Sequence, residues 1–493
     1  MKRQSSIGKV LSPQLIWALF TIALTMLLGY VLAGQIIEPN QRIIKASVGL
    51  ALLTTAFLLP NRFAVAFMLF AIPFPQNTTI GSTTVIFAFI IFSFWLLKMA
   101  LGYEKPPILT GLEPWLVTIV LLYFISFVMV QPNEMKQAIA GFRTFISAVF
   151  IFYLVTNMVR TERDIQFVLN ALILSFSVVA TIAMLELWLP GAADKLGFLK
   201  VSTRTVGKAS GVRVGSVFGD YEMFAEYCAI FIPILLIRVI SEKVLLRQII
   251  WMPLLGIGIM LLIGTATRGA FLSMIIGLTY LVWVSWRILD FQKFLPLVIV
   301  AAVAFYVFAI TLDQYTETAS LFGRLGKTKL VDGMPDTRAR VWNEAWVRIQ
   351  ESPWIGHGPY YFTGVDERNV HANYPHSLFL FLAHMIGIPG AVIFYGFLFA
   401  IIRRGYKAAR AFATERTQFA YTVVILSSCM IIFLIDEMKI SFLRYDQTQQ
   451  FTWTMFALVL ASSRVAMKRV EERKKQNLQP VARGNAPRSA RIA

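Results

Sequence analysis

Long apolar runs with almost no charge recur along the whole chain, and they restrict the fold more than any other feature of the sequence. A helix needs about 20 apolar residues to cross the hydrocarbon core of a bilayer. The sequence therefore predicts an all-α fold, a polytopic integral membrane helix bundle of about 14 spans within a range of about 12–14. The expected spans are residues 14–35, 42–59, 63–75, 83–99, 114–131, 141–158, 165–188, 221–240, 247–264, 269–286, 293–312, 376–402, 418–435 and 449–465.

The shortest of these runs, residues 63–75, leaves two interpretations open. It ends at Pro73 and Pro75, and proline disfavours continuation of a helix. It either crosses the membrane or pairs with residues 42–59 as a re-entrant hairpin.

The composition agrees with a membrane protein. Hydrophobic residues make up 57% of the 493 residues and charged residues 15%, whereas soluble domains carry about 25% charge. An ordinary soluble enzyme, a disordered chain and a fibrous protein are excluded. The two cysteines lie inside apolar runs and are too few for a disulfide framework or a zinc knuckle.

The net charge of +19 is explained by membrane topology. Lys and Arg are concentrated in alternate short segments between the runs, which predicts that both termini lie in the cytoplasm. The basic tail, residues 466–493, has no aromatic residue to stack on bases, so we expect membrane lipids as its partner and no nucleic acid.

The predicted organisation has five parts. They are N-terminal transmembrane helices at 1–205, central transmembrane helices with Arg-bearing outer loops at 206–312, one long extracytoplasmic loop at 313–375, C-terminal transmembrane helices at 376–465, and the basic cytoplasmic tail at 466–493.

The long outer loop is predicted to be partly helical. Apolar residues recur at helical spacing over residues 337–350, between a start signal at 335–337 and a stop signal at Ser352-Pro353. Trp342 and Trp346 could rest on the membrane interface. The aromatic residues that follow, Tyr360 among them, could form a plane for a sugar ring, although simple packing is the commoner fate of such residues.

All four histidines fall within residues 357–384: His357, His371, His376 and His384. His376 and His384 are eight residues apart, so a helix that begins at 376 would carry them on one face. A zinc site wants three or four ligands with acid or cysteine support. We therefore expect no metal at these histidines.

Three arginines are expected on the outer face: Arg268 and Arg213 lie next to span ends, and Arg338 opens the helix of the long outer loop. Arg268 stands in a tiny link between two apolar runs, where it either marks a functional site or snorkels to the interface. Backbone N–H groups of the link, residues 264–269, are expected to be open for an anion. Together with Arg213 and Arg338, Arg268 would form a clamp for a phosphate or pyrophosphate.

Other catalytic motifs are missing. The sequence contains no Walker A, GxSxG or HExxH motif. Asp436 and Glu437 are adjacent and point to different sides of a helix, so by themselves they make no two-carboxylate site. The energy for a reaction is therefore expected to reside in a lipid-linked substrate.

Four stretches, taken in order, resemble the O-antigen ligase / O-antigen polymerase superfamily. They are VRVGSVFGDYEMFAEY at 212–227, GTATRGAFLSMIIG at 264–277, TRARVWNEAWVRIQESPWIGHGPYYF at 337–362 and HSLFLFLAHMIGIPG at 376–390. The chain departs from the family at His384, where the family often has an acid.

The resemblance implies a metal-independent glycosyl transfer, without a cofactor, on the outer face of the bacterial cytoplasmic (inner) membrane. The donor would be a glycan on undecaprenyl pyrophosphate, and a chain-length regulator or flippase would be a possible partner. Arg268, Arg213 and Arg338 would hold the pyrophosphate, and His376 would act as base or orienting group for the acceptor hydroxyl. The further substrate contacts implied are Arg340, His384, Trp342 and Tyr360.

Three activities fit these expectations. The first is a polymerase that joins lipid-linked O-antigen or exopolysaccharide repeat units. The second is a ligase that moves finished glycan to lipid A or another acceptor. The third is a transporter or flippase of the same lipid-linked sugars, but the sequence shows no self-similar halves of the kind that transporters often have.

Overall fold

The protein is described here by a computed structural model. The described residues are 61–74, 77–78, 81–189, 204–207, 211–242, 244–286, 330–331, 334–361, 364–365, 371–372, 374–412, 417–438 and 445–478, with Glu415, Leu443 and isolated positions between 299 and 310. The expected spans 14–35 and 42–59 lie outside the described residues, as does most of 293–312.

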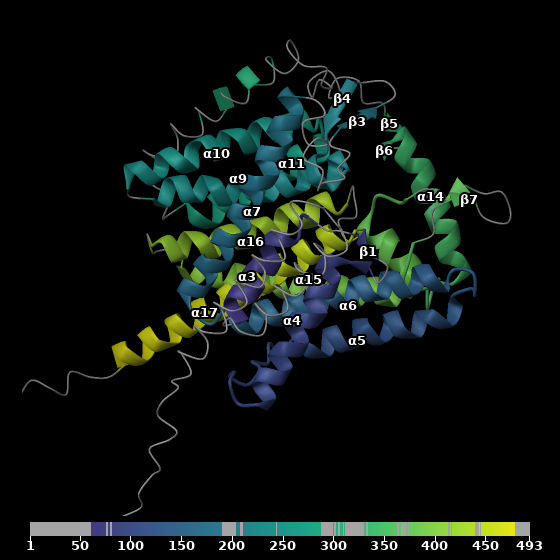
Figure 1. Ribbon diagram of the computed structural model, residues 1–493, viewed down its shortest axis with the longest axis horizontal. Coiled ribbons are helices and arrows are strands. Elements are labelled where there is room, and N and C mark those ends of the chain that lie inside the picture. Colours follow the sequence, from purple (N-terminus) through teal and green to yellow (C-terminus); the bar gives the residue numbers. More distant parts are fainter. Residues whose placement is uncertain are drawn as a thin grey trace, which may run out of the picture.

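Within these ranges the structure is a bundle of helices, most of which run along one common direction, while α14 (Asp336–Glu351) lies across them at one end (Figure 1). The helices are α3 (Asn61–Ala71), α4 (Thr83–Ala100), α5 (Glu113–Ile125), α6 (Met135–Met158), α7 (Glu162–Trp188), α9 (Tyr221–Ser241), α10 (Leu245–Gly264), α11 (Arg268–Ser285), α14 (Asp336–Glu351), α15 (Leu378–Phe412), α16 (Gln418–Asp436) and α17 (Asp446–Leu478).

Seven helices in the described part of the chain are long and apolar enough to cross a bilayer, namely α4, α6, α7, α9, α11, α15 and α16. Residues 61–71, 113–129 and 248–264 form shorter apolar helices. The protein is thus an integral membrane helix bundle, as the apolar runs predicted. The number of spans stays a prediction, and the expected span 449–465 is part of α17, which is not among the seven.

Helix α9 lies at the centre of the bundle. Nearly all of its residues from Met223 to Val239 are buried, and it packs against α10, α11 and α16. Its first turn is capped by Asp220, whose carboxylate accepts hydrogen bonds from the N–H groups of Glu222 (2.8 Å) and Met223 (3.4 Å). This cap fixes where the polar first turn of α9 emerges from the apolar core.

Short hairpins join the helices at one end of the bundle, which the sequence analysis did not predict. Antiparallel pairs form between β3 (Arg204–Gly207) and β4 (Gly211–Val214), between β5 (Leu330–Val331) and β6 (Met334–Pro335), and between β7 (Gly364–Val365) and β8 (His371–Ala372), and a fourth forms between β1 (Asn77–Thr78) and β2 (Gly81–Ser82). Strands β3 to β7 gather with α14 at the same end, at the right of Figure 1.

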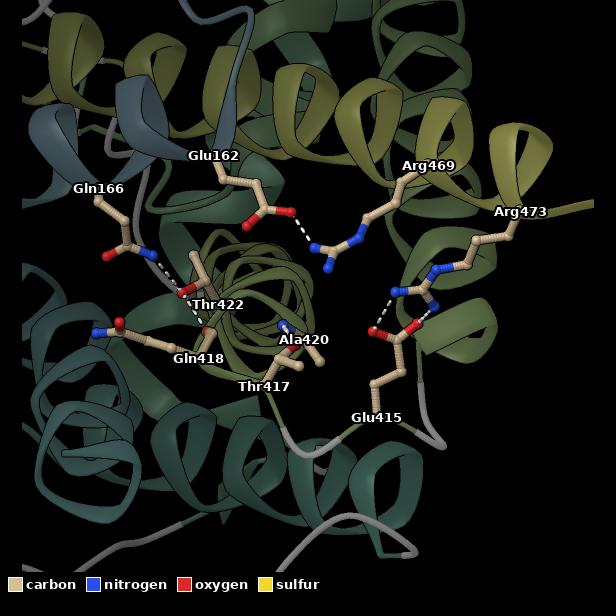
Figure 2. A network of polar contacts seen from close by, with 9 residues as sticks. All are labelled: Glu162, Gln166, Glu415, Thr417, Gln418, Ala420, Thr422, Arg469 and Arg473. Carbon is tan, nitrogen blue, oxygen red and sulfur yellow. Dashed lines mark hydrogen bonds and ion pairs between the residues drawn. The ribbon is translucent and has the colours of Figure 1, made fainter. Parts of the chain in front are cut away.

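The opposite end of the bundle is held by charged and polar pairs (Figure 2). Arg469 and Arg473 of α17 contact Glu162 at the start of α7 and Glu415 just before α16. The side chain of Thr417 caps α16 by accepting from the N–H of Ala420 at 3.2 Å. These contacts fix the polar end of the bundle that lies farthest from α14.

Candidate active site

Four of the predicted site segments meet at the α14 end of the bundle. They are β4 with Arg213, the link between α10 and α11, the start of α14 with Arg338, and the residues just before α15 with His376. Glu222, in the first turn of α9, lies within electrostatic reach of Arg213, Arg338 and His376. The structure therefore brings Arg213, Arg338 and His376 around one carboxylate, whereas the anion clamp of the three arginines stays a prediction.

The guanidinium of Arg213 binds the link that carries Arg268. Its Nε donates to the carbonyl of Thr265 at 2.9 Å, and its Nη2 donates to the carbonyl of Ala266 at 3.0 Å. Its plane lies over the ring of Tyr221, 3.3 Å from the ring centroid. With only 4% of Arg213 exposed, these contacts favour a role in positioning the link over a direct contact with substrate.

The link itself differs from the open anion nest that the sequence suggested. The N–H groups of Thr265, Ala266 and Thr267 already donate to the carbonyls of Leu261 and Ile263 and to the hydroxyl of Thr265. That expectation was wrong for these three groups because the end of α10 closes over them. The link is followed directly by Arg268, whose half-buried side chain stands at the first position of α11.

His376 does not belong to the helix that follows it. Its φ of +47° is left-handed, and α15 begins only at Leu378. The expected common helix face of His376 and His384 is therefore wrong. The Nδ1 atom of His376 lies 3.5 Å from Oε2 of Glu222, with 33% and 20% of the two side chains exposed, and its ring lies edge-on to Tyr374 at 5.6 Å.

Helix α14 places the residues predicted from the loop pattern in different environments. It spans Asp336–Glu351, which confirms the predicted helix at 337–350. Arg338 is half-buried in its first turn, whereas the side chain of Arg340 is 75% exposed and pairs with Glu344 at 3.4 Å. Trp342 packs against the core with a buried Nε1 that has no hydrogen-bond partner among the described residues.

Left-handed backbone at residues other than glycine is confined, within the described chain, to this end of the bundle. The three residues are Ser216, Ala266 and His376, with φ values between 47° and 49°. Such conformations cost about 1–3 kcal/mol each and cluster at functional sites. Their positions after β4, in the link and before α15 identify this end of the bundle as the candidate active site.

Helix α15 is broken more than two turns after its start, ten residues beyond His376. Ile386 and Gly387 leave helical geometry, with φ of −127° and +76°. The loop after α14 fills the gap: the N–H groups of His357 and Gly358 donate to the carbonyls of His384 (2.8 Å) and Met385 (3.2 Å), and Ile388 donates to Pro353 (2.8 Å). We call this pairing of residues 353–358 with residues 384–388 the loop seam.

The predicted substrate residue His384 lies inside the loop seam. Its ring stacks on His357 at 4.7 Å and lies 4.5 Å from Tyr361, and only 3% of the residue is exposed. His357 in turn is fixed by an Nε2 contact to the carbonyl of Arg348 at 2.8 Å. These contacts favour a packing role for His384. Of His371 the structure describes the backbone in β8 alone.

Tyr360 is packed rather than presented to solvent. It is 8% exposed, and its hydroxyl donates to Glu134 just before α6. Burial and the contact with Glu134 raise the pKa of Tyr360 well above its ordinary value. The exposed aromatic side chains of this region are instead Trp354 and Trp346, so Tyr360 is poorly placed as a sugar platform.

The close approach of the loop seam depends on glycine, and we expect Gly387→Ala to destabilise it. A Cβ on Gly387 would lie 2.3 Å from the carbonyl oxygen of Trp354, and its φ of +76° is strained for any other residue. Its ψ of 167° places it in a backbone region that is essentially restricted to glycine and that costs another residue about 1–3 kcal/mol, and the backbone contact adds to this cost. The measurement is the melting temperature in detergent, together with proteolysis between residues 352 and 361.

Gly102→Ala is the matched control for this substitution. Gly102 has nearly the same φ, +75°, with no described atom within 4 Å of its Cβ position. Gly102→Ala introduces a side chain at a positive φ without a steric clash. Its melting temperature should therefore fall less than that of Gly387→Ala, and residues 352–361 should stay protected from proteolysis. Equal losses in both variants would mean that the loop seam contributes nothing beyond backbone strain.

Sequence reasoning missed the acidic residues of this region. Besides Glu222, the buried Glu226 of α9 lies within electrostatic reach of Asp436 and Glu437 at the end of α16. The Asp436-Glu437 pair was set aside because two adjacent acids diverge, and only the packing of α9 on α16 brings a third carboxyl to them. Among the described residues no group of three or more His, Cys, Asp or Glu could hold a metal ion.

Comparison with known proteins gives one family. Residues 253–395 match the family model described as O-antigen ligase. No curated protein matches the chain.

The matched segment covers the part of the chain that supplies most of the candidate active site. It includes Arg268, Arg338 and His376, while Arg213 and Glu222 lie before it. The resemblance seen in the sequence is thus confirmed over residues 253–395, which match the family model described as O-antigen ligase.

Proposed function

We propose that the protein is a membrane glycosyltransferase that takes a glycan from undecaprenyl pyrophosphate and joins O-antigen or exopolysaccharide repeat units into a polymer. The observation that carries the proposal is the arrangement around Glu222. Arg213, Arg338 and His376 approach it from three different segments, and Arg213 also holds the link that ends at Arg268. Cations beside a half-buried imidazole suit a reaction that releases an anion.

In this proposal the arginines stabilise the leaving group. Arg268 and Arg338 bind the pyrophosphate, whose negative charge grows as the glycosidic bond breaks, and fixed cations at that point lower the barrier. Planar guanidinium groups can bind phosphate oxygens through two parallel hydrogen bonds. Arg213 acts indirectly, by holding the link. The exposed Arg340 and the half-buried Trp342 lie on α14, the helix that also carries Arg338.

The acceptor is activated by His376. A neutral imidazole can accept a proton near neutral pH. As the acceptor oxygen bonds to the anomeric carbon, its proton passes to His376, and the electron pair of the broken C–O bond leaves on the pyrophosphate. The proposed reaction uses no cofactor, because a pyrophosphate leaving group needs charge stabilisation rather than protonation.

Purified protein in liposomes with a lipid-linked oligosaccharide tests the proposal. We expect a ladder of products whose steps equal one repeat unit, with release of undecaprenyl pyrophosphate. A single transfer to an added lipid A acceptor, without a ladder, would replace polymerisation by ligation. Movement of intact donor across the bilayer without new glycosidic bonds would replace both by transport.

The proposed reaction takes place on the outer face of the bacterial cytoplasmic membrane, with both termini inside. The opposite end of the bundle carries Arg469 and Arg473 (Figure 2), and basic residues are concentrated on the cytoplasmic side of membrane proteins. Reporter fusions after Gln314 and after Leu478 are expected to report opposite sides of the membrane. If both fusions report the same side, the predicted topology is wrong, and the assignment of the active face fails with it.

A further inference from the structure

Glu222 was not singled out in the sequence, yet it stands at the centre of the candidate active site. It is the second residue of α9, and the Asp220 cap holds its backbone N–H at 2.8 Å. Its side chain is 20% exposed and faces the imidazole of His376. A rigid, capped helix start thus presents this carboxylate to the ring.

The geometry of the pair distinguishes the two ring nitrogens of His376. Nδ1 is buried, makes no hydrogen bond of standard geometry within the described chain, and lies 3.5 Å from Oε2 of Glu222. Catalytic hydrogen bonds in structures without substrate are often long and shorten in the complex. A proton on Nδ1 therefore has a natural acceptor, which leaves Nε2 as the nitrogen with a free lone pair.

The backbone of His376 is held in place from both sides. Its left-handed φ of +47° is followed at once by α15, whose first N–H, that of Leu378, donates to the carbonyl of Glu437 at 2.9 Å. The ring of Tyr374 closes the other side of the imidazole. A strained conformation persists only when its surroundings determine it, so the ring is held toward Glu222.

Two cations balance the carboxylate. Arg338 of α14 and Arg213 of β4 both act electrostatically on Glu222, as does His376 itself. Among the described residues, the charged groups that act on Glu222 besides His376 are the guanidinium groups of Arg338 and Arg213. A negative Glu222 is therefore compatible with its half-buried position.

We propose that Glu222 is a positioning residue for His376. It accepts a hydrogen bond from Nδ1–H and so selects the tautomer whose Nε2 faces the acceptor hydroxyl. This inference rests on the proposed function and adds a positioning residue for its base.

The proton balance of the step is complete. The acceptor hydroxyl gives its proton to Nε2 while its oxygen forms the new C–O bond, and the old C–O bond breaks toward pyrophosphate. His376 is then doubly protonated, and the negative charge of Glu222 stabilises that imidazolium. Loss of the proton from Nε2 to solvent restores the starting state, and Glu222 stays ionised throughout.

Two substitutions test the role of the carboxylate. Glu222→Gln removes the charge and can turn its amide NH₂ toward Nδ1, which would hold the wrong tautomer. The corresponding Asp→Asn change in a Ser-His-Asp triad lowers kcat about 10⁴-fold, so we expect turnover to fall about 100-fold or more. Glu222→Leu removes both the charge and the hydrogen-bond acceptor, and we expect a fall of at least about 100-fold. Donor binding should be retained in both, because the arginines carry it.

The separation of kcat from KM supplies a readout that a purely structural role would not give. Because Glu222 acts on the base, its loss should lower kcat and leave the KM for the donor nearly unchanged. Glu222→Asp should restore part of the rate. Glu415→Gln, which removes a carboxylate at the opposite end of the bundle, should leave kcat and KM unchanged.

The outcomes distinguish this inference from the proposed function. If the wild-type protein transfers glycan, His376→Ala is impaired and Glu222→Gln keeps the wild-type kcat and KM, the role of Glu222 is refuted while the function stands. If the wild-type protein transfers no glycan, the proposed function fails. If Glu222→Gln yields folded protein in which kcat falls and the KM for the donor rises as well, Glu222 supports the fold of the site without acting on His376.

Discussion

Replacement of His376 by alanine is expected to lower turnover by about 10²- to 10⁴-fold, the usual contribution of a general base. The reason is structural: the ring is half-buried, held beside Glu222, and set in a strained conformation just before α15. Donor binding should survive, because the arginines hold the pyrophosphate. Turnover is read from the product ladder, and binding is measured separately with labelled donor.

The other histidines provide the controls. His357→Ala and His384→Ala remove rings that stack in the loop seam, so they should lower the melting temperature and leave turnover of the surviving folded protein nearly unchanged. His371→Ala should be mild in both respects. If His384→Ala stops turnover in folded protein and His376→Ala does not, the base has been assigned to the wrong histidine.

Arg268→Ala is expected to reduce glycan transfer about 10- to 150-fold for each hydrogen bond lost to the pyrophosphate. A hydrogen bond to a charged group contributes about 1.5–3 kcal/mol, and each 1.4 kcal/mol corresponds to about a factor of ten. Arg268→Lys should recover only part of the loss, because lysine lacks the planar fork of arginine. Rates of transfer and the affinity for inorganic pyrophosphate both test the prediction.

Arg410→Ala is the matched control, since this exposed arginine lies near the end of α15, farthest from the site, and contacts Tyr406. It should transfer glycan like the wild-type protein. Full activity in Arg268→Ala, with normal amounts of folded protein, would mean that Arg268 only reaches toward the membrane interface.

The helices were predictable because apolar periodicity and end signals are local properties of the chain. The predicted spans 83–99, 221–240 and 418–435 agree with α4, α9 and α16 to within a residue at each end. The loop helix was equally clear, because Pro335 and Pro353 bracket a run of helical spacing.

The break in α15 was missed, although Gly387 lies at the break and Pro389 follows it two residues later. Both residue types disfavour the interior of a helix. The run around them is apolar enough to continue as one span. What decides the conformation there is the loop of residues 353–358, which replaces the missing helical hydrogen bonds. A partner that distant in sequence leaves no periodic signal.

The sequence drew attention to the cations of the candidate site and not to its anions. Arg213, Arg268 and Arg338 stood out because a charge near an apolar run or at a helix start is conspicuous, and their role in binding pyrophosphate stays a prediction. Glu222 did not stand out, because one acid in the first turn of a helix is ordinary, and its relation to His376 depends on how α9 and α15 pack. The supporting role of Arg213 was not predictable either. Its hydrogen bonds to Thr265 and Ala266, which support the link, depend on how distant segments pack.

The loop seam also determines which pieces of this protein can be exchanged with those of a relative. Backbone atoms of residues 353–358 complete the hydrogen bonding of α15, and the carbonyl of Pro359 occupies the place that a side chain at Gly141 of α6 would need. In a chimera that exchanges the outer loop alone, the loop of the relative would lie against α15, whose break fits the loop of the present chain. Crossover points before residue 334 and after residue 412 keep both partners together, so the loop and α15 are best exchanged as one unit, with a glycine retained at position 141.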